Sequence, residues 1–261
     1  MNPDIIQQAR NNTPLIHHLT NQVVMNFNAN GLLAFGGSPV MAKEIREAAD
    51  MAKASDALVL NIGTILESEA DAMITAGKAA NEKGIPVVLD PVGVAATSFR
   101  KDMVEKILQE VRPTVIKGNA GEIASLVDAN IQSRGVDSVG EGNVDEIAEQ
   151  AGRKYDTAIV ITGKTDVIHA DQKLIYNQTG HPLLSNITGS GCLLGSIAAA
   201  CLTTSYTVSE QLSSALSFYG LAAEHAAKLP HVHGPGTFLP SFIDALSFTP
   251  KQLNGGLEDD F

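Results

Sequence analysis

The chain has 261 residues, of which 44% are hydrophobic and 18% charged, a composition typical of a folded globular protein. Lysine and arginine total 18 against 29 aspartate and glutamate residues, and the resulting net charge of −11, with no basic run, argues against nucleic acid as a partner. Two cysteines exclude a disulfide framework and a four-cysteine metal site, and no apolar run is long enough to cross a bilayer.

The N-terminal part of the chain is predicted to hold a helix and no targeting signal. Residues 1–10 lack the basic flank and apolar core of a signal peptide, so we expect a cytoplasmic protein with no membrane partner. Residues 21–42 are apolar and interrupted by glycine, without the alternation of a strand. This pattern favours a helix followed by a turn.

The middle of the chain alternates between strand and helix patterns. Four nearly continuous apolar, β-branched runs are typical of strands covered on both faces: 57–63, 85–91, 113–119 and 157–163. Helical patterns, such as 67–84 and 100–111, separate them. This order predicts an α/β fold in three layers, α/β/α, with a mostly parallel central sheet and helices on both faces. Ligands bind at the carboxyl ends of strands in such sheets.

The pattern changes after the fourth run. Two alternating segments around Asp171 and Gln172 predict a hairpin at a sheet edge. Helical patterns follow at 191–204 and 208–228, and a last helix opens near the Gly-Pro pair at 234–235. Without a linker or repeat, residues 1–261 are predicted to form one domain, with 250–261 as a frayed tail.

The stretch "NITGSGCLL", residues 186–194, puts glycines and a cysteine where a helix begins. Gly189 and Gly191 could let the backbone approach a phosphate, although glycine before a helix is also common punctuation. Cys192 lies in the first turn, where helix N–H groups can lower a thiol pKa, which makes it a candidate base or nucleophile. Cys201, nine positions on, faces the opposite way on that helix and is expected to pack in the core.

Polar residues follow two of the predicted strands. Asn119 and Glu122 have the spacing of a helix cap and a first-turn acid, and Asp90 before Pro91 is an ordinary turn. Together with Lys117 they would place two carboxylates and a lysine at neighbouring strand ends, as Mg²⁺–nucleotide chemistry requires. The paired histidines at 17–18 and 231–233 lack ligand-spaced partners and are expected to be structural.

Taken in order, these motifs resemble the ribokinase-like superfamily, and within it the hydroxyethylthiazole kinases. The opening segment "PLIHHLTNQVVMNFNANGLLAFGGSPVMA" and the turn "ITGSGCLLG" carry the specific resemblance, which extends over nearly the whole chain. The resemblance implies phosphoryl transfer from ATP, with Mg²⁺, to the alcohol of 4-methyl-5-(2-hydroxyethyl)thiazole in thiamine biosynthesis or salvage. It also implies a homotrimer with substrate pockets at subunit interfaces.

The resemblance assigns roles residue by residue. Gly189 and Gly191 match an anion hole around the moving phosphoryl group, and Gly189 also lies against the substrate. The other positions expected near the thiazole are Met41, Asn21, Val24, Gly63 and Thr64. The positions matching ATP contacts are Lys117, Asn119 and Thr162. The acids matching those that organise Mg²⁺ are Asp90 and Glu122.

Cys192 departs from the wider superfamily, where most members have the catalytic aspartate. The hypothesis is that Cys192 orients the hydroxyl and accepts its proton, which leaves late in a loose transition state. Three alternatives stay open: a kinase of hydroxymethylpyrimidine or pyridoxal, an ATP- or ADP-dependent hydrate dehydratase, and a non-catalytic nucleotide-binding protein.

Overall fold

The computed structural model describes residues 1–129 and 141–254. Its strands are β1 (Leu15–Leu19), β2 (Ser38–Val40), β3 (Ala57–Asn61), β4 (Val87–Asp90), β5 (Val115–Asn119), β6 (Ala158–Thr162), β7 (Asp166–Ala170) and β8 (Lys173–Asn177). They form one sheet in the order β2-β1-β3-β4-β5-β6-β7-β8. All neighbours from β2 to β6 are parallel, whereas β7 and β8 add an antiparallel hairpin.

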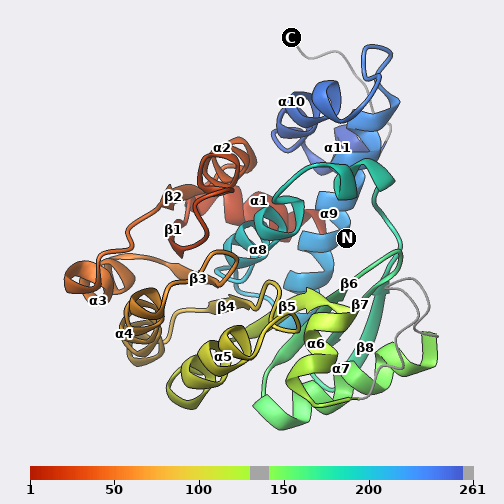
Figure 1. The fold of residues 1–261 in the computed structure, drawn as a ribbon. Coiled ribbons are helices and arrows are strands. Elements are labelled where there is room, and N and C mark those ends of the chain that lie inside the picture. The colour runs from red at the N-terminus through yellow and green to blue at the C-terminus, as the bar shows by residue number, and fades with distance from the viewer. Residues whose placement is uncertain (130–140, 255–261) are drawn as a thin grey trace.

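Helices cover both faces of this sheet (Figure 1). The helices on one face are α1 (Pro3–Asn12), α2 (Met25–Phe35), α8 (Ser190–Cys201), α9 (Val208–Lys228), α10 (Pro235–Ala245) and α11 (Pro250–Leu253), with the 3₁₀ helix η1 (Pro182–Asn186) beside them. The helices on the other face are α3 (Ile45–Ala54), α4 (Glu67–Lys83), α5 (Ser98–Glu110), α6 (Ala120–Leu126) and α7 (Glu141–Tyr155). The predicted three-layer α/β/α fold is therefore confirmed.

The continuous apolar runs are explained by this double cover. In β3, Val59 belongs to the core under α8 and α9, whereas Leu58 and Leu60 belong to the core under α4. Successive side chains of a strand point to opposite faces, so a strand covered on both sides can be apolar at every interior position. Each of these side chains is almost fully buried, which stabilises the fold by about 1.5–3 kcal/mol per residue.

The predicted elements agree with the structure at most positions. All four predicted strands are present, and the hairpin turns at Asp171 and Gln172, both of which have the positive φ of a tight two-residue turn. The prediction for 21–42 found α2 but missed β2, a short edge strand. Strand β1 and helix α1 were also missed. Within the described ranges no helix combines the length and apolarity needed to cross a bilayer.

The expected fraying of 250–261 is wrong for its first residues. Residues Pro250–Leu253 form α11, because Thr249 caps the helix and Pro250 and Leu253 are buried against α9. The remainder, from 255, lies outside the described residues.

Candidate active site

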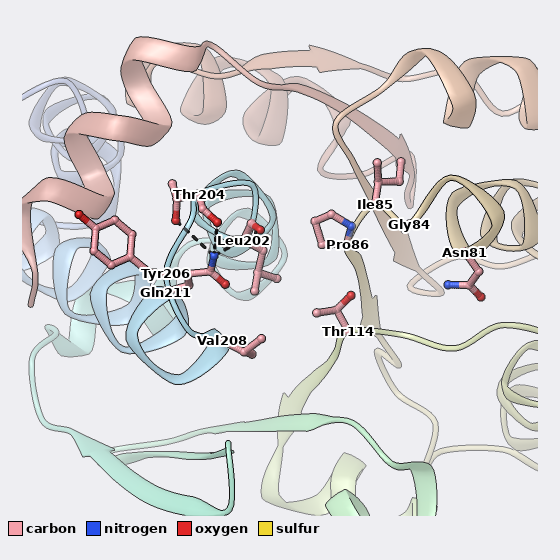
Figure 2. Close-up of a pocket in the computed structure, with 10 residues that line it drawn as sticks. All are labelled: Asn81, Gly84, Ile85, Pro86, Thr114, Leu202, Thr204, Tyr206, Val208 and Gln211. Atoms are coloured by element: carbon pink, nitrogen blue, oxygen red, sulfur yellow. Dashed lines mark hydrogen bonds between the residues drawn. The ribbon is translucent and has the colours of Figure 1, made fainter.

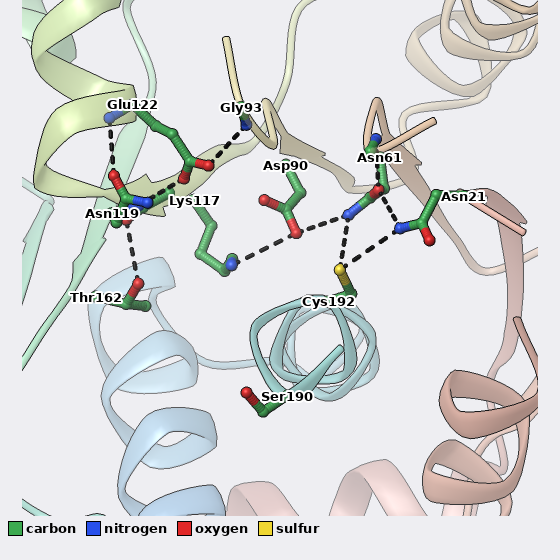
Figure 3. A network of polar contacts seen from close by, with 12 residues as sticks. Asn21, Asn61, Asp90, Gly93, Lys117, Asn119, Glu122, Thr162, Ser190 and Cys192 are labelled. Carbon is green, nitrogen blue, oxygen red and sulfur yellow. Dashed lines mark hydrogen bonds and ion pairs between the residues drawn. The ribbon is translucent and has the colours of Figure 1, made fainter. Parts of the chain in front are cut away.

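The predicted site residues meet where the carboxyl ends of parallel strands face the start of α8 (Figure 3). Asn61 ends β3 and Asp90 ends β4, and the parallel register places these two residues side by side. Cys192, in the first turn of α8, points its sulfur at Asn61 and at Asn21. The parallel sheet brings together residues that lie up to 171 positions apart in the chain.

Asn61 is the centre of this network, and sequence analysis missed it. Its Nδ2 donates to Oδ2 of Asp90 at 2.8 Å and to Sγ of Cys192 at 3.2 Å. Its Oδ1 accepts from Nδ2 of Asn21 at 2.9 Å and from the Gly63 backbone N–H at 3.0 Å. Asn61 is 2% exposed, so its amide is held in one orientation by partners on four different segments.

The Cys192 thiol is half-buried and polar on one side. Asn61 and, at 3.7 Å, Asn21 donate to its sulfur. Burial and the nearby negative charge of Asp90 raise the pKa of this thiol above its usual value, although Lys117 and the two amides oppose the shift. The expectation of a lowered pKa is therefore wrong, because burial and the charge of Asp90 raise it.

Lys117 and Asp90 form a buried ion pair. The distance from Nζ of Lys117 to Oδ2 of Asp90 is 3.5 Å, and both side chains are nearly inaccessible. Burial alone would lower the pKa of Lys117, but the negative charges of Asp90 and Glu122, together with that of Cys192 when its thiol is ionised, outweigh it and leave this pKa raised. Lys117 is thus a fixed ammonium beside the start of α8, where it lies close to Gly191.

Glu122 and Asn119 form a reciprocal capping box at the start of α6. The Glu122 N–H donates to Oδ1 of Asn119 at 2.9 Å, and Oε2 of Glu122 accepts the Asn119 N–H at 2.8 Å. Its other oxygen, Oε1, accepts the backbone N–H of Gly93 at 2.8 Å. Glu122 therefore caps its own helix and also holds the loop that follows Asp90.

The glycine turn before α8 is required by its geometry. Gly189 has φ +90°, a conformation that side chains disfavour, and a Cβ there would lie 2.5 Å from Cγ1 of Val24. The turn leads into α8, whose first N–H groups have no acceptors within the helix. Lys117 and these N–H groups together make this corner of the site suited to an anion.

The remaining predicted substrate residues surround the same sheet edge. Gly63 packs so tightly on Asn21 that a Cβ would lie 2.7 Å from Nδ2 of Asn21. The Thr64 hydroxyl accepts the Gln22 backbone N–H at 3.4 Å. Met41 is half-buried just beyond β2 and belongs to none of these polar contacts.

On the other side of the site, Thr162 ends β6 and donates its hydroxyl to the Gly118 carbonyl at 3.3 Å. The register of β5 and β6 pairs Thr162 with Asn119, two residues beyond Lys117. The predicted residues thus divide into a group around Asn21 and a group around Asn119, with Asp90 and Cys192 between them.

Comparison with known proteins decides the family. The family model described as "Hydroxyethylthiazole kinase family" matches residues 6–252. The chain belongs to this family. It is 62% identical over 256 residues to a hydroxyethylthiazole kinase of Oceanobacillus iheyensis. The matched region covers 98% of this chain and 100% of that protein.

Solved structures extend the comparison to the fold. A hydroxyethylthiazole kinase protein from Pyrococcus horikoshii matches with a TM-score of 0.87 at 34% identity, over 98% of this chain and 96% of that one. A ribokinase-like superfamily protein from Enterococcus faecalis matches with a TM-score of 0.63 at 14% identity, over 94% of each chain. The ribokinase-like fold expected from the sequence is confirmed.

Three of the histidines noted in the sequence, His17, His18 and His231, are hydrogen-bonded to protein groups. His18 is fully buried between the Ile16 carbonyl at 2.9 Å and the Ser196 hydroxyl at 2.9 Å, and burial lowers its pKa to about 4. His17 contacts the Ala42 carbonyl at 2.7 Å, and His231 contacts the Ser241 hydroxyl. In the described ranges no three histidine, cysteine or acidic side chains are grouped to hold a metal.

A separate cavity of about 450 Å³ lies at the opposite ends of the strands, beside the residues that precede β4 and β5 (Figure 2). Gln211, which lines it, donates Nε2 to the Thr204 carbonyl at 2.7 Å. The amide of Asn81 is likewise bonded to the backbone of Arg112. No charged side chain is among the residues that line this cavity, whereas Asp90, Lys117 and Glu122 lie together at or next to the strand carboxyl ends.

Proposed function

We propose that the chain transfers the γ-phosphoryl group of ATP to the primary alcohol of 4-methyl-5-(2-hydroxyethyl)thiazole, in thiamine biosynthesis or salvage. Family membership supports the reaction. The observation that carries the assignment to this site is the Cys192 sulfur at the start of α8, joined through Asn61 to the buried Asp90. Phosphoryl transfer needs an aligned acceptor hydroxyl, groups that stabilise the negative charge of the phosphoryl group, and acids that can hold a metal ion.

The thiazole alcohol binds on the Asn21 side of the site. Val24 and Gly189 pack against one another there, and Gly63 and Thr64 follow Asn61 in the chain. Met41, half-buried beyond β2, supplies a flexible apolar wall of the kind that suits a heteroaromatic ring. In this arrangement the hydroxyethyl group reaches Cys192 from the side opposite Lys117.

ATP binds on the Asn119 side, where Lys117, Asn119 and Thr162 contact it. The moving phosphoryl group lies at the Gly189 to Gly191 turn, where helix N–H groups and the Lys117 ammonium meet its negative charge. Transfer is in line, from ATP to the alcohol oxygen, with no covalent intermediate on the protein.

The chemistry of Asp90 and Glu122 fits Mg²⁺. Asp90 is buried, and in the described part of the chain only its Oδ2 has partners, so Oδ1 keeps its lone pairs. Each Glu122 oxygen accepts one backbone N–H and retains capacity for water. Mg²⁺ is usually held by one or two carboxylates, waters and substrate phosphates, and when bound it neutralises phosphate charge.

Cys192 receives the hydroxyl proton late in the transfer. Its raised pKa leaves the thiol mostly protonated at neutral pH, so only the thiolate fraction can accept that proton. Lys117 and the amides of Asn61 and Asn21 favour this fraction. The loose transition state requires little base strength, which makes a thiol sufficient here.

A cytoplasmic homotrimer with pockets between subunits completes the proposal. Three large apolar side chains in α2 and in the loops beside the proposed substrate residues are exposed: Val23 at 69%, Leu33 at 57% and Leu66 at 60%. Val23 adjoins Val24, and Leu66 lies shortly after Thr64. Burying them against another copy would close the thiazole pocket.

The test is a phosphorylation assay with ATP and Mg²⁺ on a panel of alcohols. The proposal expects phosphorylation of the thiazole alcohol at a kcat/KM well above that for hydroxymethylpyrimidine or pyridoxal, and loss of turnover in EDTA. A hydrated nicotinamide cofactor incubated with ATP should be left unchanged. The assignment would be refuted if hydroxymethylpyrimidine, pyridoxal or the hydrated cofactor were turned over in preference to the thiazole alcohol. It would also be refuted if none of these compounds were turned over.

A further inference from the structure

Arg100 joins two loops of the site without touching a carboxylate. It lies in the first turn of α5, and its guanidinium is partly buried. Nη1 donates to the carbonyls of Ile62 and Val92, both at 2.8 Å, and Nη2 donates to the carbonyl of Gly63 at 2.7 Å. Among the described residues no acidic side chain lies within ion-pair distance of it.

The three carbonyls come from two different strand ends. Ile62 and Gly63 directly follow Asn61, at the end of β3, and Val92 follows Asp90 at the end of β4. A guanidinium has several N–H donors in one rigid plane, so one side chain can hold carbonyls from separate loops at a fixed distance. Lysine has no such fork.

Both loops also contact other residues of the site. The first positions the backbone N–H of Gly63 on Asn61 and presses Gly63 against Asn21. The second is held at Gly93 by Glu122. Arg100 is therefore the link between the thiazole side, around Asn21, and the proposed Mg²⁺ side, around Asp90 and Glu122.

We propose that Arg100 is a positioning residue that sets the distance between the alcohol and the transferred phosphoryl group. This inference rests on the proposed function. Its carbonyl acceptors lie in the backbone that directly follows Asn61 and Asp90. Asn61 bonds to Asp90 and also donates to the sulfur of Cys192, so the position of these two strand ends sets the position of the thiol. A displacement of about 1 Å in such an arrangement is enough to lower turnover by about a hundredfold.

The chain offers a matched control in Arg10. Its Nη2 also donates to two carbonyls, those of Leu246 at 2.7 Å and Phe248 at 2.9 Å, and its guanidinium lies over the rings of Phe35 and Phe218. Arg10 thus has the same chemistry in a purely structural setting, away from the strand carboxyl ends. Removing it should lower thermal stability without a specific effect on transfer.

The experiment compares R100A, R100K and R10A by steady-state kinetics at temperatures well below their melting points. R100A is expected to lose about tenfold to a hundredfold in kcat for the thiazole alcohol. Guanidinium ion at about 50 mM should raise the kcat of R100A several-fold, and potassium ion at equal ionic strength is the control. R10A should keep kcat within about twofold and gain nothing from guanidinium. If R100A does not fold, R100K carries the test, with a loss in kcat at little change in melting temperature.

Wild-type kcat in R100A or R100K would overturn the proposal. So would an equal loss in R10A with no rescue of either variant, since Arg100 would then be an ordinary structural residue. Hydrogen exchange provides a readout without turnover: the amides at 62–65 and 91–94 should exchange faster together in the Arg100 variants. Unchanged exchange refutes the link, whereas an inactive wild-type protein with changed exchange refutes only the proposed function.

Discussion

Replacing Asn61 by leucine tests whether its amide aligns the site. The two side chains have nearly the same shape, so Asn61→Leu removes the hydrogen bonds without leaving a large void. The bond to the Asp90 carboxylate is worth about 1.5–3 kcal/mol, and those with Asn21 and Gly63 about 1 kcal/mol each. Burial of the leucine methyl groups returns about 1.5–2 kcal/mol.

The net expectation is a loss of about 1.5–3.5 kcal/mol in the free energy of unfolding, seen as a melting temperature about 3–14 °C lower. Turnover should fall further than stability suggests, by about a hundredfold in kcat, because Cys192 and Asp90 lose their common donor. The assay is kcat for the thiazole alcohol at saturating ATP and Mg²⁺, measured well below the melting transition.

Gln211→Met is the matched control. Gln211 is a buried amide whose Nε2 donates to the Thr204 carbonyl. It lies beside the amino ends of β4 and β5, at the opposite ends of the strands from the site. Its loss should lower stability by about 1–2 kcal/mol and leave kcat within about twofold. Wild-type kcat in Asn61→Leu, or an equal loss of kcat in Gln211→Met, would show that Asn61 contributes only to stability.

Three further predictions concern single side chains. Cys192→Ala should lower kcat about tenfold to a hundredfold with KM for the alcohol within about twofold, whereas Cys192→Asp should keep or improve turnover. In pH–rate profiles, wild-type kcat should rise with pH toward the raised thiol pKa, and Cys192→Asp should reach its plateau at lower pH. Gly189→Ala forces a side chain into φ +90° and onto Val24, and should lower kcat more than about tenfold, as steady-state assays can check. His18 is neutral when folded, so unfolding titrations should show about 3 kcal/mol of stability lost as the pH falls from about 6.5 to 4, and His18→Gln should lose less.

The fold could be predicted where burial alone determines the pattern. The strands at the centre of the sheet are apolar on both faces, so their runs are visible in the sequence. Strand β1 was missed because two of its five residues are His17 and His18, which are buried and bond to the Ala42 carbonyl and to Ser196. These are tertiary contacts, and a local pattern does not contain them.

The site could be predicted only as a set of strand-end residues. Asp90, Lys117 and Glu122 were found because carboxylates and a lysine after strands are unusual together. Asn61 looked like an ordinary end of a strand, since its partners lie 29, 40 and 131 positions away. The direction of the Cys192 pKa shift was mistaken for the same reason, because Asp90 and burial reach the thiol only through the folded chain.

Because the pKa of the Cys192 thiol is raised, little thiolate is present at neutral pH, and catalysis depends mainly on how the reactants are aligned. At neutral pH, Lys117 and Asp90 offset one another in charge, and the uncharged Cys192 adds no repulsion toward an incoming phosphate. A weak base suffices only where the alcohol and the phosphoryl group are already aligned, because proton removal then comes late. Variants that disturb alignment, at Asn61 or Arg100, should therefore cost at least as much turnover as removal of the sulfur itself. A much larger loss in Cys192→Ala than in either of them would mean that the thiol, and not the framework around it, limits the rate.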